Sequence, residues 1–163
     1  MIICPNTSPL IVLARLEQLD LLGDPADVRL TRAVQDEIRD KQDEVAARVA
    51  TLVATTPPII DDAPSARVDP LRGLGRGERS VLSYALATGA DVLCVLDDAA
   101  ARAEARRLQV SFTGTLGLIL KAKTAGRVSQ AAPLLRRAVE AGLYLDDSTL
   151  RRALTTVGEV WPG

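Results

Sequence analysis

An unbroken apolar run, Val92–Leu96, ends at two adjacent aspartates and constrains the fold of this chain more than any other feature. A strand with one solvated face alternates apolar and polar residues, whereas a run without a polar member is typical of a strand buried on both faces of a parallel sheet. A glycine-rich loop and an apolar-faced helical segment come before the run, and an alanine- and arginine-rich helical segment comes after it. Residues 73–108 are therefore predicted to form a helix–strand–helix unit of an α/β fold.

Short strand-like segments alternate with helical patterns along the rest of the chain. Ser8 and Pro9 are typical of a helix start, with the serine as N-cap, and Thr31 is expected to cap the next helix. Ser148 or Asp147 is expected to cap the last helix. This alternation predicts a parallel sheet with helices on both faces, with further short strands at 1–4, 28–30, 59–60, 109–112 and 143–145.

The composition excludes several classes of function. With 163 residues, of which 47% are hydrophobic and 25% charged, the chain is long and apolar enough for one globular domain. A net charge of -1 excludes nucleic-acid binding through overall basicity, and an aromatic content of 2% argues against a base-stacking platform. The absence of histidine removes the Ser-His-Asp triad and the usual catalytic zinc sites. Any chemistry therefore depends on carboxylates, amides, hydroxyls, arginine and lysine.

The two cysteines and the N-terminal segment indicate the compartment. Cys4 and Cys94 each lie in an apolar, strand-like run, which predicts two buried, reduced thiols. The N-terminal segment has no basic stretch before a long apolar run, and no segment approaches 18 apolar residues. From the sequence we therefore expect a cytoplasmic protein without a signal peptide or a membrane span.

Three carboxylates around the central unit indicate a cation site. Asp97 and Asp98 follow the buried strand, at the edge where parallel sheets place their ligands, and Glu78 opens the preceding helix. If the start of that helix folds over the same edge, the carboxylates repel one another, and a divalent cation such as Mg²⁺ or Mn²⁺ removes that repulsion. The alternative is that Asp98 is a helix N-cap while Asp97 and Glu78 are solvated.

Four short motifs occur in an order that resembles the PIN-domain superfamily, and more narrowly its prokaryotic branch related to VapC-like toxins. They are N-T-S-P-L at 6–10, G-L-G-R-G-E at 73–78, L-D-D at 96–98 and T-G-T-L-G at 113–117. The resemblance covers nearly the whole chain. It implies a single PIN-like domain over residues 1–163, a three-layer α/β/α sandwich around a parallel β-sheet, and Mg²⁺- or Mn²⁺-dependent endonucleolytic cleavage of RNA.

The resemblance also implies which residues form the site. The four acids of the family fall on Asn6, on Glu37, on Glu78, and on either Asp97 or Asp98. Carboxylates that hold a divalent metal suit phosphodiester hydrolysis, and this chemistry does not require histidine. Asn6 departs from the family pattern, because its amide oxygen can bind Mg²⁺ but brings no charge. Read alone, asparagine at this position is a turn former.

Three further residues are candidates for substrate contact. Thr7 or Ser8 matches the hydroxyl that follows the first acid in the family. Arg76 lies in the glycine-rich loop, where an arginine can hold a phosphate through two hydrogen bonds. Three other arginines, at 102, 106 and 107, are expected to form a solvated helix face.

Three functions remain open at this point. The first is a metal-dependent ribonuclease, the toxin half of a toxin–antitoxin pair, for which the family implies an antitoxin partner and a homodimer. The second is a nucleic-acid-binding or regulatory module that keeps the fold but has lost catalysis through Asn6. The third is a receiver-like signalling domain, which the acidic pair disfavours because it follows a central strand rather than the first one.

Overall fold

The computed structural model describes residues 1–41, 43–56 and 65–163. Within them, three parallel strands form one sheet in the order β1 (Ile2–Pro5), β2 (Val92–Val95) and β3 (Phe112–Thr113). Cys4 pairs with Cys94, which in turn pairs with Phe112. The apolar run 92–96 is thus the middle strand, as its lack of alternation predicts.

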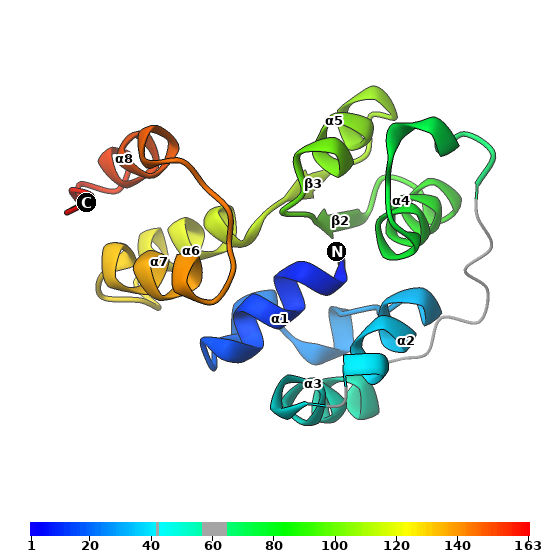
Figure 1. Ribbon diagram of the computed structural model, residues 1–163, viewed down its shortest axis with the longest axis horizontal. Helices are drawn as coiled ribbons and strands as arrows, with labels where there is room; N and C mark the ends of the chain where they lie inside the picture. The colour runs from blue at the N-terminus through cyan, green and yellow to red at the C-terminus, as the bar shows by residue number, and fades with distance from the viewer. Residues whose placement is uncertain (42, 57–64) are drawn as a thin grey trace.

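Helices surround the sheet and make a three-layer α/β/α arrangement. Figure 1 shows the strands between α5, above them, and α1, below them, with α6, α7 and α8 grouped at the end that holds the C-terminus. The α-helices of the described residues are α1 (Thr7–Arg15), α2 (Arg32–Lys41), α3 (Glu44–Thr55), α4 (Arg76–Thr88), α5 (Ala99–Arg107), α6 (Thr115–Thr124), α7 (Ala131–Glu140) and α8 (Asp147–Thr155). Short 3₁₀ turns lie at Leu19–Leu22, Pro25–Asp27 and Pro70–Arg72.

The core lies between the sheet and these helices. Cys4 and Cys94 are free thiols that are fully buried, as predicted. Burial raises the pKa of Cys94 to about 12 and that of Cys4 well above its ordinary value, so both are protonated. None of the helices of the described residues has the length and apolar content that crossing a membrane requires.

Side-chain caps begin several of the helices. The Thr31 hydroxyl accepts a hydrogen bond from the Val34 amide at 3.2 Å, which confirms the predicted cap of α2. Asp98 caps α5 in the same way through the Ala101 amide at 2.8 Å. The cap of α8 is Asp146 rather than Asp147 or Ser148, so that prediction was wrong by one residue.

The predicted helix start at Ser8 was also wrong. Helix α1 begins at Thr7, with Asn6 as its N-cap residue. The reason is that the backbone N–H of Asn6 extends the strand ladder by donating to the Val95 carbonyl at 3.0 Å. The chain can therefore turn into the helix only after that bond. Pro9 still fits, because the first turn of a helix has amides without intrahelical partners.

Two predicted strands are not regular strands. Val28 makes only an isolated parallel bridge with Ile3. Residues 143–145 are not a strand, because Gly142, at φ +113°, ends α7 and the Leu143 amide turns back to the Ala138 carbonyl at 2.9 Å. Leu143 is buried as the apolar residue of this helix stop, which explains its strand-like appearance in the sequence. The strand predicted at 59–60 lies outside the described residues.

Candidate active site

Asn6 connects the sheet to the candidate site. It follows β1 directly, is 3% exposed, and has extended backbone angles. Its Nδ2 donates to Oε1 of Glu78 at 3.0 Å. Its Oδ1 is buried and has no hydrogen-bond partner among the described residues. A buried amide oxygen without a partner costs free energy, and such an atom in a native fold calls for an explanation.

Glu78 reaches Asn6 because of the way α4 begins. Gly75 is the N-cap of that helix and Glu78 its third residue, and the Gly75 amide donates to Glu78 Oε2. This is the backward half of a capping box, in which a glutamate satisfies the N-cap amide. The helix opens at Arg76, two residues before Glu78. The first turn of α4 thus places the carboxylate over the end of β1.

Glu37 approaches the same point from α2. Its Oε2 accepts a hydrogen bond from the Thr7 hydroxyl, and its Oε1 accepts one from the Gly77 amide at 2.9 Å. A Cβ on Gly77 would lie 2.6 Å from Asn6 Oδ1 and 2.7 Å from Glu37 Oε2. Position 77 therefore has to be glycine for the asparagine and the glutamate to approach each other this closely.

A groove of about 320 Å³ contains these groups. We call it the Asn6 groove. It is lined by Asn6, Thr7, Ser8, Ile11, Val12, Arg15, Glu37, Lys41, Glu78, Ala141 and Gly142. The structure thus brings together five of the eight residues selected from the sequence, of which Ser8 is exposed. A larger pocket, of about 500 Å³, lies between α6 and the strands and contains none of the predicted site residues.

Asp97 is engaged elsewhere. Its two carboxylate oxygens accept hydrogen bonds from the Thr115 amide and hydroxyl, both at 2.7 Å. Burial raises the pKa of Asp97, against the opposing effect of the Thr115 hydrogen bonds and of Arg102. Asp97 follows the strand that pairs with β1, but its carboxylate holds the start of α6 rather than lining the Asn6 groove.

The other two candidates also have structural partners. The exposed Asp98 caps α5, which agrees with the alternative interpretation of this residue. Arg76 forms an exposed ion pair with Asp36 at 3.2 Å. Within the described ranges, no group of three or more cysteine, aspartate or glutamate side chains is placed to hold a metal ion. The Asn6 groove instead offers two glutamates and an amide oxygen.

The sequence and the fold can now be placed in a family. The PIN-domain family DUF3368 matches residues 1–159. The chain belongs to the PIN-domain family. No curated protein matches it. Membership confirms the resemblance of the four motifs and, with the parallel sheet, the predicted α/β/α sandwich. The PIN fold is of the nuclease type, so a nuclease function is supported in general terms.

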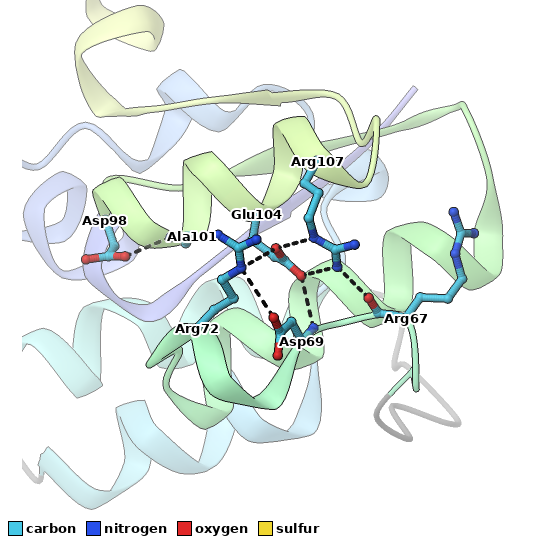
Figure 2. Close-up of polar contacts among 7 residues, drawn as sticks. All are labelled: Arg67, Asp69, Arg72, Asp98, Ala101, Glu104 and Arg107. Atoms are coloured by element: carbon cyan, nitrogen blue, oxygen red, sulfur yellow. Dashed lines mark hydrogen bonds and ion pairs between the residues drawn. The ribbon is translucent and has the colours of Figure 1, made fainter.

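The sequence did not indicate the role of a further carboxylate, Glu104, which lies outside the Asn6 groove. Glu104 is fully buried on α5, and Figure 2 shows it between two arginines. Arg107 donates to its two oxygens at 2.5 and 2.8 Å, and Arg72 lies 3.6 Å from Oε2. The Asp69 amide donates to Oε1 at 2.9 Å. We call these four residues the Glu104 cluster.

The Glu104 cluster attaches the segment before α4 to α5. The hydrogen bonds from Arg107, with its charge and that of Arg72, outweigh burial and lower the pKa of Glu104 to about 2. Arg107, predicted to be on a solvated helix face, therefore has a buried partner. One signal was present in the sequence: Glu104 lies on the same helix face as Ala101, Ala105 and Leu108, where an apolar residue is expected.

Proposed function

We propose that this PIN domain is a metal-dependent endoribonuclease whose reaction centre is the end of the Asn6 groove that holds Asn6, Glu37 and Glu78. The observation that carries the proposal is the buried Asn6 Oδ1, which has no partner among the described residues. It lies beside a carboxylate oxygen of Glu37, around the space that Gly77 leaves open. An unpaired oxygen next to two glutamates is what a hard cation requires.

The residues present fit Mg²⁺ or Mn²⁺. The donor set contains only oxygen atoms, and its two negative charges are not balanced by an ion pair with an arginine or lysine among the described residues. Asn6 Oδ1, Glu37 and Glu78 would hold the cation. When bound, it would polarise the phosphodiester and lower the pKa of a water molecule.

The chain's own residues orient this donor set. The Thr7 hydroxyl and the Gly77 amide hold the Glu37 carboxylate, and the Gly75 amide holds the Glu78 carboxylate. These donors are neutral, so each carboxylate keeps its charge for a cation. Because the donors come from the first turns of α1 and α4, the site is built on rigid elements.

Asp97 rather than Asp98 is the fourth acid in this proposal. Asp98 is exposed and its oxygen caps α5, so moving it would leave the Ala101 amide without its partner. Asp97 is half-buried after the strand paired with β1, and this partial burial raises its pKa. Each of its carboxylate oxygens accepts one hydrogen bond from Thr115 and keeps lone pairs for a further interaction.

The wider proposal is a toxin of a toxin–antitoxin pair. It comprises one PIN-like domain over residues 1–163, RNA as substrate, an antitoxin protein as inhibitor, a homodimer, and action in the cytoplasm. Family membership supports nucleic-acid binding in general. Sedimentation of the chain alone tests the homodimer.

One observation favours a second candidate, a catalytically weakened PIN-fold module that binds or regulates nucleic acid. The Asn6 amide nitrogen donates to Glu78, a contact that a carboxylate at position 6 could not make. This hydrogen bond stabilises the glutamate without a cation. In that case RNA would be bound and not cut, and Asn6→Asp would create cleavage that the natural chain lacks.

The deciding experiment is RNA cleavage by the purified chain in Mn²⁺ and in EDTA. The expected result is Mn²⁺-dependent cleavage that Glu78→Gln reduces by about 100-fold, since the amide keeps the shape and removes the charge. Glu140→Gln, a change to an exposed glutamate on α7, is the matched control and should cut normally. Cleavage in EDTA, or equal rates for wild type and Glu78→Gln, would contradict the nuclease proposal.

A further inference from the structure

An exposed aromatic residue closely follows, in the chain, two residues that line the Asn6 groove. Ala141 and Gly142 line the groove where α7 ends, and Tyr144 follows two residues later. Chain geometry keeps the Cα of Tyr144 within about 7 Å of that of Gly142. The Tyr144 side chain is 93% exposed. The Tyr144 ring is therefore accessible to a ligand that extends past Gly142.

The backbone that carries Tyr144 is held on both sides. Arg15 donates to the Ala141 carbonyl at 2.8 Å, which fixes the segment to the end of α1. The next side chain, Leu143, is buried, and Asp146 begins α8. Tyr144 therefore projects from a fixed segment, so that little conformational freedom is lost when its ring is covered.

Two cations line the same groove. Arg15 lies on α1 seven residues after Ser8, about 10 Å along the helix axis from the rim of the proposed reaction centre. Lys41 lies one turn after Glu37 on α2 and is exposed. Among residues 1–41, 43–56 and 65–163, Arg15 contacts a carbonyl rather than a carboxylate, and Lys41 has no ion pair. Both charges remain available for anions.

Asp146, two residues after Tyr144, is the first acid that follows the ring in the chain. The Asp146 carboxylate accepts hydrogen bonds from the Thr149 amide and hydroxyl, both at 2.8 Å, and these bonds lower its pKa. Its charge is held at the start of α8, where the helix dipole stabilises it. The lining of the groove therefore includes two cations, Arg15 and Lys41, as well as the carboxylates of Glu37 and Glu78.

We propose that Tyr144 is a stacking subsite for one unpaired base of a single-stranded nucleic acid whose phosphates pass Arg15 and Lys41 in the Asn6 groove. The inference rests on the proposed function, because it places the strand in the groove of the reaction centre. Every base has a π-face that can stack on a tyrosine, and neighbouring cations hold the phosphates. A double helix hides those faces, so the subsite selects for unpaired residues. One ring is a subsite rather than the platform that the low aromatic content argues against.

The test is filter binding by the full chain in EDTA, with oligouridylate as the probe and a ribose-phosphate oligomer without bases for comparison. Tyr144→Ala is expected to weaken oligouridylate binding by roughly tenfold and to leave the binding of the abasic oligomer unchanged. Tyr144→Phe should restore the affinity, because the ring remains. Val160→Ala, a change to another exposed apolar side chain in the C-terminal tail, is the control.

The salt dependence separates stacking from a structural effect. Tyr144→Ala should leave the slope of log affinity against log salt unchanged, whereas Arg15→Gln should reduce it by about one. A change of slope in Tyr144→Ala, equal loss for both oligomers, or no loss of affinity overturns the subsite. So does sedimentation showing that Tyr144→Ala abolishes self-association, because the ring is then a protein contact.

The outcomes distinguish the two proposals. Failure of the wild type to bind either oligomer overturns the subsite. Normal, Tyr144-dependent binding by a chain that does not cleave RNA in Mn²⁺ overturns the nuclease and leaves the subsite standing. If the chain cleaves RNA in Mn²⁺ and Tyr144→Ala binds oligouridylate as tightly as the wild type does, the subsite is overturned and the nuclease stands.

Discussion

Two carboxylate clusters of this PIN domain differ in whether their negative charge is balanced by arginines. In the Glu104 cluster, a buried glutamate is neutralised by two arginines and its pKa falls to about 2. In the Asn6 groove, the hydrogen bonds that Glu37 and Glu78 accept from the described part of the chain come from neutral groups, and the oxygen of Asn6 has no partner there. The first arrangement leaves no capacity for a ligand, whereas the second keeps negative charge and an open oxygen. The absence of an ion pair to Glu37 or Glu78 among the described residues, rather than the number of acids, marks the candidate active site.

The largest expected effect is on stability, from removing the centre of the Glu104 cluster. Glu104→Ala leaves the Asp69 amide and two arginines without their shared acceptor, so the free energy of unfolding should fall by about 3 kcal/mol. Denaturant unfolding followed by circular dichroism measures it, with the exposed Glu140→Ala as control. A loss below about 1 kcal/mol would show that the cluster is not a structural anchor.

Gly77→Ala should lower activity rather than stability. The added Cβ would meet the oxygens of Asn6 and Glu37, and because these are side-chain ends they can move aside. Alanine also favours the helix, so stability should be unchanged or slightly higher. Mn²⁺-dependent cleavage should fall by about 100-fold, the equivalent of about 2.7 kcal/mol. If cleavage survives, Asn6 and Glu37 need not be close, and the assignment of the site is wrong.

Asn6→Asp sharpens the comparison by adding a negative charge beside Glu37 and Glu78 in the Asn6 groove. Without metal, the loss of the hydrogen bond to Glu78 and the new repulsion should lower stability by about 1 kcal/mol. Mn²⁺ should more than restore it, because a ligand that binds only the folded state stabilises that state. Melting temperatures in EDTA and in Mn²⁺ measure both effects. No difference between the two media would contradict a metal site at Asn6.

The smallest effect near neutral pH is expected from the protonation of Glu104, which changes the free energy of unfolding only in acid. Its folded pKa, about 2, lies below the ordinary value of 4.5, so the unfolded chain binds the proton first as the pH falls. The stability contributed by Glu104 is therefore complete above pH 4.5 and is lost progressively between 4.5 and about 2. Urea unfolding at several pH values should show that Glu104→Gln lacks this component of the pH dependence. A wild type and variant with parallel curves would mean that the arginines do not control this carboxyl.

The sequence predicted the frame of the fold well because its signals are local. The run Val92–Leu96 has no polar residue, and only the middle of a parallel sheet suits it. Local signals failed where a tertiary contact was stronger. Ser8 is a good helix cap, but the ladder bond of Asn6 to Val95 starts the helix earlier, and buried Leu143 is the end of a helix rather than a strand.

The candidate site was only partly predictable for the same reason. The motifs indicated Asn6, Glu37 and Glu78, which the fold brings together although Asn6 and Glu78 are 72 residues apart. The direction in which Asp97 points depends on Thr115, 18 residues away, and no spacing in the sequence determines it. Tyr144 had no signal at all, because an exposed tyrosine in a loop becomes informative only when the groove beside it is known.

The C-terminal tail contains a residue whose fluorescence can be followed during unfolding. Trp161 is the single tryptophan of the sequence, is 8% exposed, and donates through Nε1 to Asp147 at 3.3 Å. Its emission spectrum is therefore an intrinsic optical report on whether the tail is docked against α8. A red shift at lower denaturant than the loss of ellipticity would reveal that the C-terminal tail detaches before the rest of the molecule melts.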